Sequence, residues 1–158
     1  CAMIAHALAQ LAITRHGSAL DAQKVTTLAL YHDAGEVLTG DLPTPVKYKN
    51  AEIKKAYKTI EAMANQQLLS MLPADLRDGY APYLTPDKNS YEWKLVKAAD
   101  RICAYIKCVE EKKAGNLEFV QAQISIEKSI SDLEMPEVKD FMTEFVPAYE
   151  LTLDEMSK

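Results

Sequence analysis

Apolar residues recur every three or four positions along most of the chain, which is the spacing of amphipathic α-helices. Such stripes cover residues 3–12, 22–29, 53–68, 95–109, 117–133 and 138–145. Alanine, leucine, lysine and glutamate are frequent, while runs of β-branched residues are scarce, which also favours helices over strands. The pattern predicts an all-α protein, and we expect a single domain over residues 1–158.

Residues that begin or end helices lie at several of the expected boundaries. Gly17 is expected to close the first helix in the left-handed conformation, and Asp21 and Asn50 are expected to cap the next helix and the long helix after it. Because Pro73 stops the long helix, residues 74–83 are expected to form only a short helical turn followed by a surface loop.

Composition and charge narrow the classes of partner. The 158 residues carry a net charge of −5 and have a pI near 5.2, which argues against a polymeric nucleic acid as the partner. No apolar run approaches the roughly 20 residues that span a bilayer, and no leader is recognisable, so no membrane partner is expected. Three cysteines, odd in number and unevenly spaced, are expected to be free thiols in a reducing cytoplasm.

Candidate chemistry is concentrated in residues 31–45, a segment with the sequence YHDAGEVLTGDLPTP. Its five candidate groups are one imidazole, three carboxylates and the hydroxyl of a threonine: His32, Asp33, Glu36, Asp41 and Thr44. We expect the second helix to carry His32 and Asp33 near its C-terminal end. Imidazole and carboxylate together suit a divalent transition metal, and the spare carboxylates suit proton transfer.

A further aspartate, Asp100, stands among apolar residues in the sequence AADRI. An unpaired carboxylate on a buried stripe is costly, so Asp100 is expected to bind a metal, a cation or strong donors. The alternative is that Asp100 pairs with Arg101 or a lysine, that His32 is a satisfied core histidine, and that the other acids are ordinary surface acids.

His32-Asp33 followed by Asp100 resembles the pattern of the HD-domain superfamily of metal-dependent phosphohydrolases. More narrowly, YHDAGEVLTGDLPTPVKY resembles the YfbR-type 5'-deoxynucleotidases, as do AMIAHALA near the start, LVKAADRICAYIKCVEE in the middle and FVPAYELTLDE near the end. The resemblance covers essentially the whole chain and implies a helical HD-domain fold.

The resemblance also implies a function and a set of site residues. Proteins of this family form homodimers and remove the 5'-phosphate from deoxyribonucleoside monophosphates, using a divalent ion such as cobalt, manganese or another first-row metal. His32, Asp33 and Asp100 match the metal ligands, and Glu36 and Asp41 match the acids that assist catalysis. The positions that match substrate contacts are Asp33, Asp41, Leu42, Pro43, Thr44 and Asp100.

One part of the family pattern is not found in the chain. The first histidine ligand and an Arg-Trp pair that holds the deoxyribose should precede Cys1, so we expect the chain to lack its N-terminal helical segment. His6 is about nine residues from the expected ligand position, a helical rotation of roughly 900°, so it would face the other way. We expect His6 to pack in a helix interface, and His16 to stabilise the end of its helix.

The sequence therefore predicts metal-assisted hydrolysis of a phosphomonoester. Glu36 is expected to act as the general base or to orient the water, and Asp41 either to orient the same water or to protonate the leaving 5'-oxygen. Two alternatives stay open. One is another HD-domain phosphohydrolase that acts on a nucleoside triphosphate or a cyclic dinucleotide; the other is a catalytically dead helical module for dimerisation or regulation.

Overall fold

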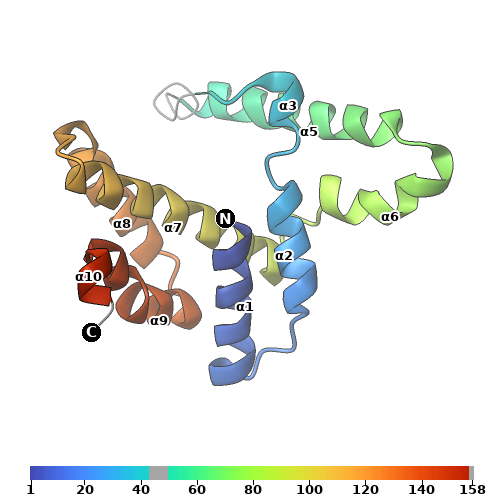
Figure 1. The fold of residues 1–158 in the computed structure, drawn as a ribbon. Helices are drawn as coiled ribbons and strands as arrows, with labels where there is room; N and C mark the ends of the chain where they lie inside the picture. The colour runs from blue at the N-terminus through green and yellow to red at the C-terminus, as the bar shows by residue number, and fades with distance from the viewer. Residues whose placement is uncertain (43–49, 157–158) are drawn as a thin grey trace. The chain divides into compact units, whose positions relative to one another are not determined.

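The computed structural model describes residues 1–42 and 50–156, and every regular element in these ranges is helical (Figure 1). The longer helices are α1 (Ala2–His16), α2 (Ala22–Tyr31), α5 (Ala51–Met71), α6 (Ala74–Leu84), α7 (Tyr91–Lys113), α8 (Val120–Ser131) and α9 (Pro136–Glu144). The short ones are α3 (Glu36–Thr39), η1 (Leu117–Phe119), η2 (Val146–Glu150) and α10 (Leu153–Met156). The predicted all-α fold class is confirmed. None of the helices described has both the length and the apolar character that crossing a membrane requires.

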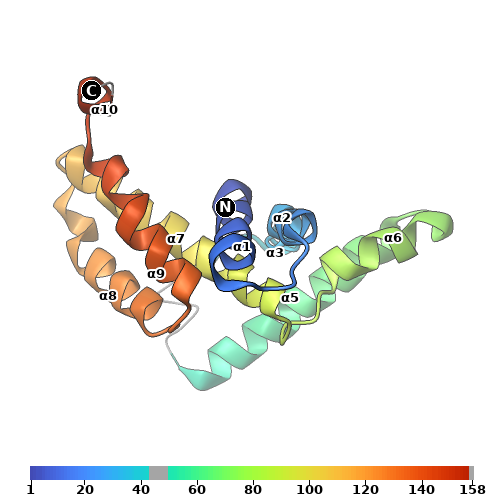
Figure 2. The same ribbon diagram turned by 90° about the horizontal axis from the view of Figure 1, so that it is seen from below.

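The chain divides into two compact units, which are described separately. The first comprises residues 1–29 and 90–158 and is built around α7, which packs against α1 and α8, while α1 also packs against α9 (Figures 1 and 2). One side of α7 is buried between Leu95 and Val109, through Leu95, Val96, Ala98, Ala99, Ile102, Tyr105, Ile106, Cys108 and Val109. The predicted apolar stripe of this helix is therefore the core of the first unit.

The second unit comprises residues 30–89, with α3, α5 and α6. Helix α6 turns back along α5, and α3 packs against α5 (Figure 1). Tyr57 and Ala64 of α5 and Leu84 of α6 are the buried apolar residues of these two helices. The prediction of one domain over residues 1–158 stays a prediction.

The expected helix boundaries are confirmed at three places. Gly17 closes α1 with a left-handed φ of 66°. The side chain of Asp21 accepts hydrogen bonds from the backbone N–H groups of Gln23 and Lys24, at 2.9 and 3.1 Å, and that of Asn50 accepts one from Ile53, at 2.8 Å. All three cysteines are free, as expected.

One expected boundary is wrong. Residues 74–83 form most of a complete helix, α6, rather than a short turn and a loop, although Pro82 lies inside it. A proline removes a hydrogen bond from a helix interior. Here the packing of α6 along α5 and the burial of Leu84 outweigh that local cost, because most helical stability comes from tertiary packing.

A cluster of charged side chains joins α1 to α9 within the first unit. Arg15 donates two hydrogen bonds to the carboxylate of Glu144, at 2.5 and 2.9 Å, and His16 Nε2 lies 3.0 Å from Asp140 Oδ2. The hydrogen bond from Arg15 holds the pKa of Glu144 below its ordinary value, and the one with His16 does the same for Asp140.

Because the pKa of Glu144 is lowered on folding, its contribution to stability is present above the unfolded pKa of 4.5 and is lost as the pH falls through the lower folded pKa. Glu144→Gln is therefore expected to lower the melting temperature at pH 7 and to match the wild type in strong acid. Thermal unfolding followed by circular dichroism across this range measures the difference. Glu127→Gln, at an exposed glutamate of α8, is the control. A deficit in Glu144→Gln that did not change with pH would contradict the assignment.

Candidate active site

The candidate residues of the second unit are arranged around a turn, residues 32–35, that joins α2 to α3. The N–H of Ala34 donates to the carbonyl oxygen of Tyr31 at 3.0 Å, and the N–H of Glu36 donates to that of Asp33 at 2.9 Å. These bonds, each spanning three residues, end α2 at Tyr31. The expectation that the second helix itself carries His32 and Asp33 is therefore wrong.

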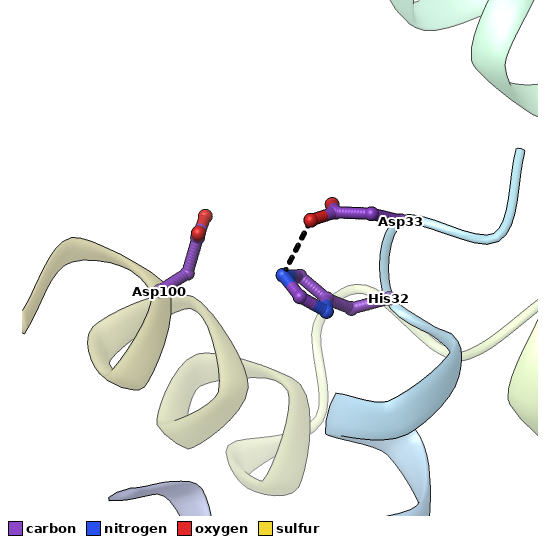
Figure 3. A group of neighbouring side chains, drawn as sticks. All are labelled: His32, Asp33 and Asp100. Carbon is purple, nitrogen blue, oxygen red and sulfur yellow. Dashed lines mark ion pairs between the residues drawn. The ribbon is translucent and has the colours of Figure 1, made fainter. Parts of the chain in front are cut away.

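The turn lets two adjacent side chains converge. On a helix, neighbouring side chains diverge by about 100°. Here His32 Nε2 lies 2.8 Å from Asp33 Oδ2, as Figure 3 shows. The imidazole is only 9% exposed, whereas the carboxylate is 49% exposed. The pair thus presents an oriented nitrogen donor and a carboxylate with access to solvent.

Aromatic packing fixes the residue before the pair. The ring of Tyr31 stacks on that of Tyr83, with centroids 5.9 Å apart, and meets the ring of Tyr80 edge-on at 6.0 Å. Both partners belong to α6, so this helix holds the chain at the point where α2 ends. Sequence reasoning missed this contact, since α6 was not expected to be a helix.

Asp100 belongs to the first unit and lies on α7 (Figure 3). Its neighbours Ala99 and Ile102 are fully buried, but its own side chain is 39% exposed and forms an ion pair with Lys97. The expected place of Asp100 on the buried stripe is therefore wrong, because Asp100 lies at the edge of that stripe, whereas its expected pairing with a metal, a cation or strong donors is met by the cation Lys97. The structure pairs Asp100 with a lysine, which was one of the alternatives considered for it.

Lys97 was not singled out from the sequence, although its position carried a signal. Residues three apart on a helix are neighbours, and an oppositely charged pair at that spacing is favourable. Arg101, the other cation considered for Asp100, instead donates to the backbone oxygen of Ser129 at 2.8 Å.

The remaining candidates follow the turn. Glu36 is the first residue of α3 and is partly buried, Asp41 is exposed, and Leu42 is partly buried. Pro43 and Thr44 lie outside the described residues. His32, Asp33, Glu36 and Asp41 thus all belong to the second unit.

The two other histidines have no place among these residues. His6 is exposed on α1, with its Nε2 3.5 Å from Gln10 Nε2, so the expectation that it packs in a helix interface is wrong. His16 lies in the last turn of α1 and pairs with Asp140, which agrees with its expected role at a helix end.

Comparison with known proteins places the whole chain in one family. A family model described as 5'-deoxynucleotidase YfbR-like matches residues 1–149. The chain is 48% identical to a 5'-deoxynucleotidase of Vibrio vulnificus over 157 residues, covering 99% of this chain and 81% of that protein. It is 49% identical to a 5'-deoxynucleotidase of Citrobacter koseri, covering 99% of this chain and 79% of that protein.

A solved structure supports the fold independently. The crystal structure of an HD-domain phosphohydrolase from Listeria innocua matches with a TM-score of 0.77 at 24% identity, covering 99% of this chain and 78% of that one. The expected HD-domain fold is confirmed. The family match and the curated relatives together show that the chain belongs to the YfbR-like 5'-deoxynucleotidase family.

Proposed function

We propose that this protein is a metal-dependent 5'-deoxynucleotidase, which hydrolyses deoxyribonucleoside 5'-monophosphates to a deoxynucleoside and phosphate. The observation that supports this most strongly is identity of 48–49% to proteins named 5'-deoxynucleotidase over 99% of the chain. The pair of His32 and Asp33 agrees with this function, because it places an imidazole nitrogen and a carboxylate, both possible metal ligands, side by side within the segment that resembles the family.

We propose that His32, Asp33 and Asp100 hold a divalent first-row ion such as cobalt or manganese. One imidazole and two carboxylates are a donor set that such ions accept. Asp100 is included because it matches a ligand of the family. Its ion pair with Lys97 is compatible with this role, since a carboxylate has lone pairs for more than one partner. When bound, the ion supplies positive charge for a phosphate oxygen and lowers the pKa of a water molecule.

The acids that follow the turn are proposed to move the protons. Glu36 accepts a proton from the attacking water. At the same time the oxygen of that water bonds to phosphorus, and the bond from phosphorus to the 5'-oxygen breaks. Asp41 either gives the leaving 5'-oxygen its proton or orients the same water, in which case the proton that Glu36 has accepted passes to the leaving 5'-oxygen. The loop of Asp41, Leu42, Pro43 and Thr44 is proposed to contact the nucleotide, together with the ligands Asp33 and Asp100.

The wider setting is proposed from the chain as a whole. A net charge of −5 favours a single nucleotide over a nucleic-acid polymer, because a polyanion binds through many basic contacts. The three free thiols support a cytoplasmic location. A homodimer is proposed on the resemblance to the family.

Removal of a ligand is expected to remove the ion. His32→Ala, Asp33→Ala and Asp100→Asn should each weaken cobalt or manganese binding by about 100-fold or more, measured by isothermal titration calorimetry on the purified protein. His6→Ala and Asp132→Asn, away from the proposed ligands in sequence, are the matched controls. Unchanged metal affinity in His32→Ala would contradict the ligand assignment.

Removal of the proposed base is expected to separate turnover from metal binding. Glu36→Gln keeps the size of the side chain but cannot accept the proton, so kcat for deoxynucleotide hydrolysis should fall about 10²- to 10⁴-fold with the metal content unchanged. Glu52→Gln, at an exposed glutamate of α5, should retain activity. Wild-type turnover in Glu36→Gln would show that another group takes the proton.

A further inference from the structure

The helix that begins with Glu36 is too short to hold its own position. Helix α3 has only four residues, and isolated helices of that length do not persist in water. Within the second unit it packs against α5, the 21-residue helix that follows in the chain. The place of Glu36 therefore depends on what α5 presents to the two ends of α3.

At the start of α3, the backbone of Gly35 lies against the side chain of Asn65. A Cβ atom on Gly35 would come within 2.7 Å of Asn65 Oδ1 and 3.3 Å of Asn65 Cγ. Gly35 has φ of −60° and ψ of −24°, which any residue can adopt, so the backbone conformation does not require glycine. A side chain at position 35 would instead have to displace the amide of Asn65.

The amide oxygen of Asn65 faces the interior. Its Oδ1 is buried and has no hydrogen-bond partner among the residues that the structure describes. A buried amide oxygen without a donor costs stability, and an apolar side chain of similar size would avoid that cost. Stability of α5 therefore does not explain an asparagine at this position.

At the end of α3, a second residue of α5 makes contact. The hydroxyl of Tyr57 donates to the carbonyl oxygen of Gly40 at 3.3 Å, and the side chain of Tyr57 is 4% exposed. The N–H of Gly40 in turn donates to the carbonyl oxygen of Glu36 at 2.8 Å. Tyr57 and Asn65 are eight residues apart, so they belong to one i, i+4, i+8 row of α5.

We propose that Asn65 and Tyr57 are positioning residues of the active site, which hold the two ends of α3 and so set where the Glu36 carboxylate stands relative to His32 and Asp33. Neither residue touches the reacting atoms in this proposal, which rests on the role of Glu36 proposed above. Misplacement of a reacting group by about 1 Å can cost 100-fold in rate, so fixing so short a helix has a direct catalytic effect.

The test compares kcat, KM and metal affinity between the wild type and single variants, with deoxyribonucleoside 5'-monophosphates as substrates. Asn65→Ala should lower kcat about 10- to 100-fold, with KM, metal affinity and melting temperature close to wild type. Tyr57→Phe, which removes only the hydroxyl, should lower kcat in the same way by a smaller factor. Gln66→Ala, at an exposed amide of the same helix, is the matched control.

Gly35 supplies a rescue experiment. Gly35→Ala should lower kcat because its new methyl group meets Asn65. The double variant Gly35→Ala with Asn65→Ala should have a kcat at least about five-fold higher than Gly35→Ala alone, since the methyl group then occupies the space that Asn65 vacated. Gly79→Ala, where a Cβ meets no atom within 4 Å, should have no effect.

The results separate this proposal from the function on which it rests. Inactive Glu36→Gln combined with wild-type kcat in Asn65→Ala and Tyr57→Phe would overturn the positioning role and leave the nucleotidase standing. Loss of kcat only in proportion to a lowered melting temperature would also overturn it, because that is the signature of a purely structural role. Activity in Glu36→Gln would instead refute the assignment of the base.

Discussion

The termination of α2 at Tyr31 is the constraint on which the candidate site depends. Had the helix continued, His32 and Asp33 would point about 100° apart. The turn that replaces it brings His32 Nε2 within 2.8 Å of Asp33 Oδ2 and starts the next helix at Glu36. An imidazole and two carboxylates thus follow within five positions of the helix end.

Helices of the second unit hold this turn from two sides. Tyr80 and Tyr83 of α6 enclose the ring of Tyr31, and α5 meets the turn and the end of α3 through Asn65 and Tyr57. Asp100 is held differently. It lies on α7 at the edge of that helix's buried stripe, with Lys97 as its local counterion. Each group is therefore supported by regular structure rather than by a free loop, which suits a site that must keep fixed geometry.

The helical fold could be predicted because its signals are local and periodic. Two kinds of local signal agree with the structure. One is the apolar stripe from Leu95 to Val109, which is buried, and the other is the set of helix caps at Gly17, Asp21 and Asn50. The chemistry of residues 31–45 and its resemblance to the family could likewise be read from consecutive residues. Prediction succeeded where a few neighbouring residues contain the whole signal.

What could not be predicted depends on contacts between distant residues. The helical pattern does not reveal that α2 stops one residue before His32, since that depends on turn hydrogen bonds and on packing with α6. Residues 74–83 form a helix instead of the expected short turn and loop because the burial of Leu84 and the packing on α5 are tertiary effects. Asp100 was expected on the buried stripe because its sequence neighbours are apolar. Successive residues of a helix are rotated by about 100°, however, and Asp100 lies beside Lys97 at the edge of the core. The contact between Gly35 and Asn65 joins two helices and leaves no trace in local sequence.

The most direct test of the account is phosphate release by the purified protein from matched deoxyribonucleoside and ribonucleoside 5'-monophosphates, with cobalt or manganese and with a chelator. We expect release from the deoxy substrates that requires the ion and is much slower with the ribonucleotides. No phosphate release from any monophosphate with any metal would contradict the proposed function and favour a catalytically dead helical module. Activity only toward triphosphates or cyclic dinucleotides would indicate a different HD-domain phosphohydrolase.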